Sequence, residues 1–355
     1  MNILITGGCG FLGSNIASSF LVDGCRVTIV DKMLKPGARN NLEWLKGIAK
    51  REKDLVSVEV DISDFNALEK VFSMQGPFDF ICHLAGQVAM TTSLASPLSD
   101  FHTNALGTLN LLENVRHKSP SAFLAFSSTN KVYGDLRNLD YLELEKRYVL
   151  QGFSNGIDES MPLDFASPYG CSKGCADQYV RDWYRNFGVA TVVFRHSSIF
   201  GGRQYSTVDQ GWIGWFVKNA LQQNATRCKD RGAVEPFTIS GTGKQVRDVL
   251  HSDDLISLYR LAYEKRGECA GEVFNIGGGM QNSMSLLELF DHLSRLLDMQ
   301  EGLVYSHAPR RLSDQDFFVA DISKVQRILG WKPKIAAVEG LSLMLDWVES
   351  CFDLH

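Results

Sequence analysis

The sequence contains no apolar run that approaches the roughly 20 residues needed for a membrane-spanning helix. It also has no room for a secretory signal, because the first strand-like residues, 3–5, come almost directly after Met1. These two absences predict a cytoplasmic protein with no membrane partner.

The chain likewise lacks an excess of positive charge and any pattern of paired cysteines. Its formal net charge of -5 gives no overall attraction to nucleic-acid phosphates or anionic lipid. The eight cysteines are scattered, and we expect them to be reduced thiols. Only Cys171 and Cys175 lie close together, and no second Cys or His pair accompanies them to complete a tetrahedral metal site. We therefore predict no nucleic-acid partner and no metal, and core packing for these two thiols.

The first 200 residues alternate short apolar runs with segments of helical length. This alternation predicts an α/β fold with a doubly wound parallel sheet of the Rossmann type. The runs are apolar at successive positions, which is typical of strands covered by helices on both faces. The predicted strands are residues 3–6, 26–30, 55–60, 78–83, 123–127 and 191–194.

After about residue 201 the regular alternation of short apolar runs and helix-length segments ends. A chain of 355 residues is also longer than a single hydrophobic core usually allows. We predict a first domain over 1–200 and a smaller C-terminal substrate-binding lobe over 201–355, and leave open whether part of the lobe returns to the first domain. Residues 136–164 are polar and highly charged, and we expect them to form an inserted loop with little regular structure and a functional role. In the lobe we expect helices at 209–223, 253–265 and 285–297, and strands at 237–240 and 272–276.

Glycines 7, 10 and 13 follow the first predicted strand and open a helix. Gly7 suits the tight turn, Gly10 the close approach of backbone to a pyrophosphate, and Gly13 the close packing of helix on strand. The start of the helix, with Phe11 and Leu12, then directs free N–H groups at the phosphates. The pattern predicts a dinucleotide site in the first domain.

Asp31 ends the second predicted strand, at the distance from the glycines that suits an adenosine ribose. A carboxylate there binds both ribose hydroxyls and repels a 2'-phosphate, which favours NAD over NADP. Lys32 is a candidate for a phosphate contact or a solvated charge, and Asp61 is a candidate for the cleft or for a helix N-cap. The other cofactor candidates, which follow strands at the same edge of the sheet, are Ile62, Leu84, Ala85 and Gly86.

Tyr169 and Lys173 are four residues apart, so they place a phenol and an ammonium on one face of a helix. The ammonium would lower the pKa of the phenol from about 10, which would make Tyr169 a proton acceptor. A surface pair is the commoner meaning of this spacing. Here the pair begins the helix after Ser167 and Pro168, downstream of a predicted strand and in a chain with a dinucleotide fingerprint, and this position favours catalysis.

These motifs and several others make the sequence resemble the extended short-chain dehydrogenase/reductase family over nearly its whole length. The resemblance implies a Rossmann-like NAD domain with a substrate lobe, and an activity on nucleotide sugars. Beside the glycine fingerprint and the Tyr169/Lys173 pair, the motifs in family order are His83-Leu84-Ala85-Gly86, Asn104-Ala105-Leu106-Gly107-Thr108, Ser127-Ser128-Thr129 through Val132-Tyr133-Gly134, Arg247-Asp248 through Asp253-Asp254, and Phe274-Asn275-Ile276-Gly277.

The resemblance implies that Thr129 completes a triad with Tyr169 and Lys173, and that Asn104 and Ser127 lie beside the cofactor. Tyr169 would take a proton from a sugar hydroxyl while hydride passes to NAD, and hydride would return to the opposite face of the keto intermediate. The protein would thus be an epimerase with no net redox change. Similarity at residues 86–93, 128–135 and 195–198 implies a CDP-linked 3,6-dideoxyhexose inverted at C2.

Other activities of the family remain open, among them a UDP-hexose 4-epimerase and a nucleotide-sugar ketoreductase. A dehydratase is disfavoured, because Asn130 and Lys131 follow Thr129 where dehydratases of the family have an acidic pair. Outside enzymes, the alternative is an inactive NAD-sensing protein on the same fold. The intact catalytic residues argue against it.

Arginine forks suit phosphate oxygens, so arginines are candidates for holding the substrate diphosphate. Arg247 is the strongest because it lies in a family motif, whereas a surface salt bridge is an equal alternative for Arg203 and Arg310. Three polar residues that are expected near the sugar, with ordinary loop hydrogen bonding as the alternative, are Gln87, Thr91 and Gln204.

Members of the family commonly associate through two long helices, here predicted at 97–117 and 168–187. Extra apolar positions widen the stripe on these helices beyond what the sheet needs to cover. We predict a homodimer or homotetramer. The apolar positions in question are Leu109, Leu112, Tyr179 and Trp183.

Overall fold

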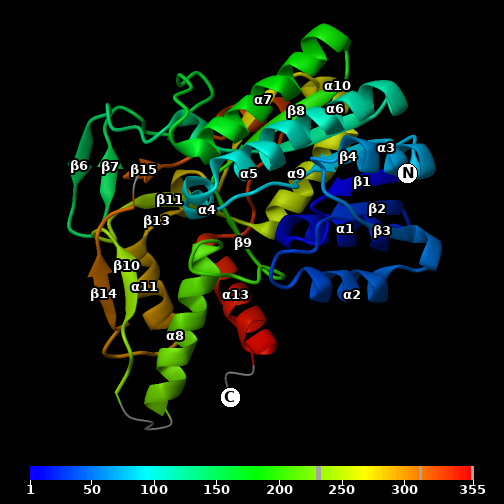
Figure 1. Cartoon of the computed structure of the whole chain (residues 1–355). Helices are drawn as coiled ribbons and strands as arrows, with labels where there is room; N and C mark the ends of the chain where they lie inside the picture. Colours follow the sequence, from blue (N-terminus) through cyan, green and yellow to red (C-terminus); the bar gives the residue numbers. More distant parts are fainter. Residues whose placement is uncertain (229–232, 312–313, 353–355) are drawn as a thin grey trace.

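The computed structural model describes residues 1–228, 233–311 and 314–352 (Figure 1). Its centre is a seven-stranded parallel sheet with the order β12-β8-β5-β4-β1-β2-β3, which confirms the predicted α/β fold. The strand order reverses between β1 and β4, where such sheets open a ligand crevice. The strands are β1 Asn2–Thr6, β2 Arg26–Asp31, β3 Leu55–Glu59, β4 Phe80–His83, β5 Phe123–Thr129, β8 Thr191–His196 and β12 Val273–Ile276.

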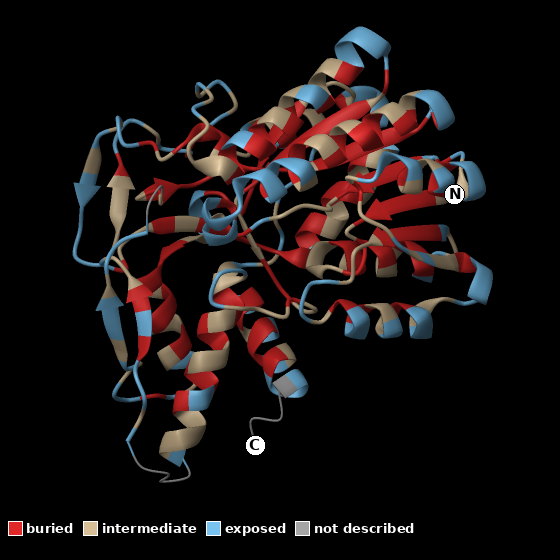
Figure 2. Ribbon diagram, in the orientation of Figure 1, coloured by how far each residue is buried: buried red, intermediate tan, exposed pale blue. Residues whose placement is uncertain are grey.

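Successive side chains of β1 enter two separate hydrophobic layers, as the absence of alternation predicted. Ile3 and Ile5 pack into one layer and Leu4 into the other, and all three are fully buried. Figure 2 shows the strands of this sheet buried between helices. One layer is formed by α1 Phe11–Val22, α2 Ala38–Ile48, α9 Ser252–Glu264 and α12 Ser323–Leu329, and the other by α3 Phe65–Gln75, α6 Gly107–Lys118 and α7 Ser167–Phe187.

A third hydrophobic cluster forms the core of the C-terminal lobe, where α8, α11 and α13 pack together beside two paired strands (Figure 1). A mixed sheet made of β9, β11, β13 and β15 lies between this lobe and the main sheet. The lobe elements are α8 Trp212–Cys228, β10 Phe237–Ser240, α11 Leu286–Leu296, β14 Tyr305–Ala308 and α13 Ala337–Phe352, and the mixed sheet contains β9 Ser198–Phe200, β11 Val246–His251, β13 Ser283–Ser285 and β15 Phe317–Phe318.

Two elements that we predicted in the C-terminal lobe belong to the first domain instead. The strand expected at 272–276 is β12, which pairs with β8 at the edge of the main sheet. The helix expected at 253–265 is α9, which packs on α1. The physical reason is visible in β12 itself, because Val273 faces one layer while Phe274 and Ile276 face the other. The chain therefore returns twice to complete the dinucleotide domain, first with α9 and β12 and again with α12.

The inserted segment 136–164 has more structure than we expected. It forms an antiparallel hairpin of β6 Tyr141–Glu143 and β7 Tyr148–Leu150. Beyond the hairpin, Ile157 bridges to Ala320 and is fully buried in a fourth hydrophobic cluster, so the segment is anchored.

The two helices expected at a subunit interface are present as α7 and as a continuous run made of α5 Pro97–Phe101, a π-helical turn His102–Leu106 and α6. Two of the four apolar positions were misassigned, since Leu112 is fully buried and Trp183 is only 6% exposed, both within the molecule's own core. Tyr179 is 40% exposed and remains on the surface. Among the described residues, none of the helices combines the length and apolar character that crossing a membrane requires.

Candidate active site

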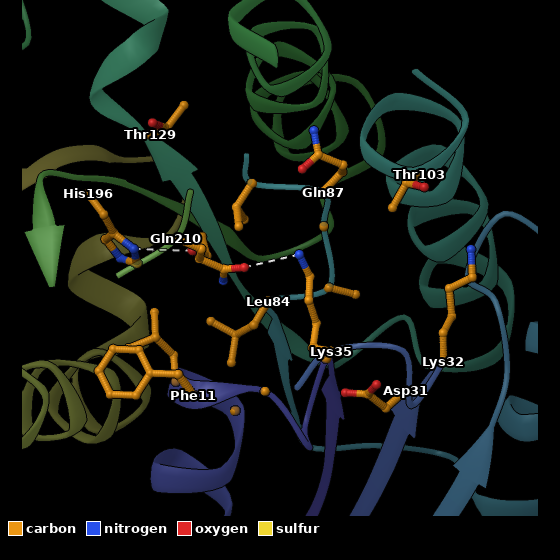
Figure 3. Close-up of a pocket in the computed structure, with 18 of the residues that line it drawn as sticks. Phe11, Asp31, Lys32, Lys35, Leu84, Gln87, Thr103, Thr129, His196 and Gln210 are labelled. Carbon is orange, nitrogen blue, oxygen red and sulfur yellow. Dashed lines mark hydrogen bonds between the residues drawn. The ribbon is translucent and has the colours of Figure 1, made fainter. Parts of the chain in front are cut away.

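A cavity of about 450 Å³ opens at the carboxyl ends of the central strands, within the size range of small-molecule sites. It is lined by the glycines of the dinucleotide fingerprint and by two of the three catalytic candidates, Thr129 and Tyr169. Figure 3 labels Phe11, Asp31 and Thr129 among the lining residues. The predicted residues that line it are Gly7, Gly10, Phe11, Leu12, Gly13, Asp31, Lys32, Ile62, Leu84, Ala85, Gly86, Gln87, Ser127, Thr129, Tyr169 and Gln204. The predicted residues that do not line it are Asp61, Thr91, Asn104, Lys173, Arg203, Arg247 and Arg310.

The glycine loop fits as closely as the fingerprint predicted. Gly7 has φ +70°, and a Cβ there would lie 2.8 Å from the backbone nitrogen of Ala85. A Cβ on Gly13 would lie 2.2 Å from the carbonyl oxygen of Gly7. No side chain caps the start of α1 at Gly10, so this helix end offers N–H groups to a phosphate in the cavity.

The Asp31 side chain lines the cavity and also forms hydrogen bonds to the protein backbone. Its carboxylate accepts hydrogen bonds from the backbone N–H of Cys9 at 3.0 Å and of Met33 at 2.8 Å. It therefore braces the glycine loop and the loop after β2. Lys32 forms an ion pair with Asp61 at 2.5 Å. Asp61 does not cap α3, since that role belongs to Asp64, whose carboxylate accepts from the N–H of Ala67.

Tyr169, Lys173 and Thr129 converge where α7 begins over the end of β5. Tyr169 shares a hydrogen bond with the Thr129 hydroxyl, and Thr129 in turn accepts from the N–H of Lys131 at 3.2 Å. Lys173 donates from Nζ to the carbonyl oxygen of Ser127 at 2.5 Å, and its Nζ lies 4.2 Å from the centre of the Phe126 ring. The geometry suits removal of a proton from a hydroxyl placed between Thr129 and Tyr169.

Burial dominates the electrostatics of this pair. It raises the pKa of Tyr169 to about 12, so the expected lowering from about 10 is wrong for the protein alone. Burial also lowers the pKa of Lys173 to about 7. At neutral pH Tyr169 is therefore a neutral phenol, and Lys173 lies close to its own pKa.

The far wall of the cavity holds side chains that sequence reasoning did not select. His196 is a neutral imidazole, because burial lowers its pKa to about 3. Its Nδ1 lies 3.1 Å from the Ser127 hydroxyl, while its buried Nε2 and the buried Oε1 of Gln204 have no partner among the described residues. These orphaned polar atoms fit a ligand with an amide group, such as the carboxamide of a nicotinamide. His196 lies within a motif that resembles the family, but its residue chemistry gave no signal.

Gln87 and Asn104 hold the loop after β4 in place. The Gln87 side-chain amide donates to the Ala89 carbonyl oxygen at 2.7 Å and to Asp100 at 2.9 Å, and it accepts from the Ala89 N–H at 2.5 Å. Asn104 binds both the N–H and the carbonyl oxygen of Gln87, and donates to Ser172 at 2.9 Å. Both amides are therefore committed to the protein itself.

Positive charge gathers beside Thr129, next to the catalytic end of the cavity. Arg247 donates to Asp314 at 2.7 Å, and Lys131 lies 3.7 Å from the same carboxylate. Arg310 pairs with Asp316 at 2.8 Å. The carboxylate of Asp135 also acts on Lys131, so the cations are largely paired, and the two guanidinium forks are the feature that suits a diphosphate.

The remaining two predicted substrate residues lie away from the cavity. The Arg203 guanidinium stacks 4.1 Å from the centre of the Trp44 ring, and Thr91 is exposed on α4 Met90–Ala95. The structure instead brings Lys35 and Gln210 to the cavity, joined at 3.0 Å, and neither spacing nor motif marked them (Figure 3). Within the described residues, no group of three or more His, Cys, Asp or Glu side chains is placed to hold a metal.

Comparison with known proteins adds to this geometry. The family model described as GDP-mannose 4,6 dehydratase matches residues 4–344. The CDP-paratose 2-epimerase of Salmonella typhi is 49% identical over 350 residues, covering 99% of this chain and all of that protein (100%). The structure of UDP-glucose 4-epimerase from Thermotoga maritima with UDP-glucose is 28% identical, with a TM-score of 0.81 and 99% of both chains covered. That of the Thermus thermophilus UDP-glucose 4-epimerase in complex with NAD is 25% identical, with a TM-score of 0.79 over 99% of this chain and 100% of the other.

Proposed function

The chain belongs to the extended short-chain dehydrogenase/reductase family, in the group described as GDP-mannose 4,6 dehydratase, and from this premise we propose that it inverts C2 of a CDP-linked 3,6-dideoxyhexose. The reaction would convert CDP-paratose to CDP-tyvelose. The observation that carries the proposal is the 49% identity, over 99% of the chain, to a CDP-paratose 2-epimerase. The enzyme is an NAD-dependent isomerase of nucleotide sugars, and the proposal concerns the base, the sugar and the carbon.

The dinucleotide end of the cavity would hold NAD through the Gly7 to Gly13 loop, the start of α1 and Asp31. NAD supplies a hydride acceptor that gives the hydride back, so the sugar is oxidised only transiently. Thr129 orients the sugar hydroxyl, and Tyr169 accepts and later returns its proton. Lys173 supplies the positive charge that favours a phenolate.

At the other end, the cluster of Lys131, Arg247 and Arg310 would hold the diphosphate of the substrate. Asn130 supports this assignment, because it lines the cavity and directly precedes Lys131 in the chain. It also donates to Gln315 at 3.1 Å, and Gln315 directly follows Asp314, which accepts from Arg247. Gln87, with its amide committed to the loop, would act on the sugar only through that loop.

The test is to incubate the protein with CDP-paratose and a panel of CDP- and UDP-sugars in water and in deuterium oxide, and to locate the inverted carbon by NMR. We expect inversion at C2 of the CDP-sugar without deuterium at that carbon, since hydride returns from the cofactor and not from solvent. Inversion at C4 of a UDP-hexose alone would replace this proposal by the 4-epimerase alternative. A ketoreductase would instead consume reduced cofactor in proportion to product and release the oxidised cofactor.

We also propose that the molecule is a cytoplasmic homodimer or homotetramer assembled through α5, α6 and α7. Support comes from exposed apolar side chains on α5, namely Leu98 and Phe101, and on α7, namely Tyr179 and Phe187. Because Trp183 belongs to the core, the informative change is Tyr179→Glu, which places a charge on the surface without opening the molecule. Light scattering should show a smaller particle for this variant at an unchanged melting temperature. A wild-type monomer, or a fully assembled variant, would contradict this interface.

A further inference from the structure

A buried carboxylate lies beneath the catalytic helix. Asp100, on α5, is 1% exposed. One of its oxygens accepts hydrogen bonds from Gln87 at 2.9 Å and from Asn104 at 3.3 Å, and the other accepts from the Ser172 hydroxyl. Ser172 is 4% exposed and lies on α7 directly before Lys173. The carboxylate therefore touches the turn of helix that carries the catalytic pair.

All three donors to Asp100 are neutral. In the described part of the chain, no Lys, Arg or His side chain forms an ion pair with it, although it is almost completely removed from solvent. A buried carboxylate without a cation is costly unless positive charge lies nearby. A buried ammonium that the Asp100 carboxylate influences is that of Lys173, the residue directly after Ser172.

The other charged and titratable groups around Lys173 are already compensated or neutral. Asp177, one turn further along α7, is held by the Arg195 guanidinium through two hydrogen bonds of 2.9 Å. His83 on β4 and His196 on β8 are neutral, because burial lowers the pKa of each to about 3. Lys131, on the turn Asn130–Tyr133 that packs against α7, pairs with Asp314. Asp177 thus acts on Lys173 but is also paired with Arg195, whereas Asp100 is a buried carboxylate near Lys173 for which the described residues supply no ion-pair partner.

We propose that Asp100 is the counter-charge of Lys173, a positioning residue that favours the ammonium form of this side chain during the reaction. The inference rests on the catalytic roles proposed above. When Tyr169 takes the sugar proton, bound NAD would accept the hydride, so the phenolate charge and the charge of the cofactor ring would cancel before the step and both be absent after it. An ammonium at Lys173 would remain in both states, and the carboxylate of Asp100 would balance it in both.

The electrostatics agree with this role. Burial lowers the pKa of Lys173, and the carboxylates of Asp177 and then Asp100 act against that lowering. Burial raises the pKa of Tyr169, and the carboxylate of Asp100 raises it further. Removing the charge should therefore lower the pKa of both groups. Activity alone would mix these two effects, so the test must observe Lys173 directly.

The experiment is an NMR titration of protein with ¹³C-labelled lysine, in which the Lys173 signal is assigned as the one absent from Lys173→Arg. We expect Asp100→Asn to lower the pKa of Lys173 by about one unit or more. The matched control is Ser172→Ala, which removes one hydrogen bond to Asp100 but leaves the charge, and should leave the lysine titration in place. The kcat of Asp100→Asn should fall between about pH 6 and about pH 8, relative to wild type, as Lys173 loses its proton.

An unchanged Lys173 titration in Asp100→Asn would overturn the proposal, even if activity were lost. Because the titration needs no substrate, it remains informative if the sugar proposed above is wrong. Asp100→Ser is a second uncharged variant with a smaller side chain, and circular dichroism checks that each variant folds. Failure of both uncharged variants to fold would assign Asp100 a structural role and also overturn the proposal.

Discussion

The two ends of the cavity are built in different ways. The dinucleotide end is lined by the glycine loop, Asp31 and Ala85, and its backbone packs so closely that a Cβ does not fit at Gly7 or Gly13. The catalytic and sugar end is made of side chains that meet from distant parts of the chain. Asn130 and Gln315 are 185 residues apart, and Arg247 and Asp314 are 67 apart.

The difference follows from what each end must bind. A dinucleotide has one shape, and a backbone cradle can be rigid around it. A sugar that is oxidised from one face and reduced from the other must turn within its site, so a rigid wall would prevent the reaction. Changes at the dinucleotide end should therefore abolish binding through backbone geometry, whereas changes at the sugar end should act through chemistry while the molecule stays intact.

The largest effect is expected from Tyr169→Phe. The change removes the phenol oxygen that we propose as the proton acceptor but keeps the ring that packs at the start of α7. Turnover should fall by roughly 10²- to 10⁴-fold or more, while the protein still folds and holds NAD. Steady-state kinetics and the absorbance of released cofactor measure the two properties. Near-normal turnover would remove Tyr169 from the mechanism.

At the opposite end, Gly13→Ala should abolish NAD binding without touching any catalytic side chain. Its Cβ would lie 2.2 Å from the Gly7 carbonyl oxygen, so the loop must move away from the helix that it caps. The matched control is Gly47→Ala in α2, where a Cβ meets nothing within 4 Å. That control should keep NAD and gain up to about 1 kcal/mol of stability from the better helix former. Calorimetry with NAD and thermal unfolding compare the two, and equal NAD affinity in both variants would contradict the tight-cradle interpretation.

The same contrast explains what could be predicted from the sequence. The strands, the glycine loop, Asp31 and the Tyr169/Lys173 pair depend on spacing within a few dozen residues, and that information is local. Arg203 was a reasonable phosphate candidate, yet it stacks on Trp44, because its orientation is decided by a helix more than 150 residues away in the chain. The return of β12 to the sheet could have been read from its two-sided apolar pattern.

Asp31 combines a side-chain role with a backbone role, since its carboxylate lines the cavity where the ribose of NAD is proposed to bind and also accepts from two backbone N–H groups. Asp31→Ala should weaken NAD by roughly 10- to 100-fold, equivalent to about 1.4 to 3 kcal/mol, through loss of charge-assisted hydrogen bonds. It should also reduce the preference for NAD over NADP, because the repulsion of a 2'-phosphate is gone. Asp31→Asn keeps an acceptor oxygen for the loops but loses the charge. If calorimetry shows that Asp31→Asn retains full discrimination, the residue acts mainly as a brace.

The smallest effect is expected at the edge of the cavity, where Lys35 contacts Gln210. Their Nζ and Oε1 atoms are 3.0 Å apart at the cavity edge (Figure 3). A second contact also holds the two segments together, because Gly37 packs against the ring of Tyr205. A Cβ on Gly37 would lie 1.9 Å from that ring. The hydrogen bond therefore joins the loop after β2 to the segment that precedes α8, across the mouth of the dinucleotide site.

An epimerase must keep its cofactor between turnovers, and this bond should slow its release. Both side chains are exposed, so the bond should contribute only about 0.5 kcal/mol, which is a two- to threefold change in the rate of NAD release. Lys35→Ala and Gln210→Ala should each accelerate release by about that factor, and the double variant should do no more than either alone, because both remove the same bond. Stopped-flow release of NAD measures this cycle, with the exposed Lys332→Ala as a control for the loss of one surface charge. Additive effects in the double variant would show that the two residues act on the cofactor separately and not through their bond.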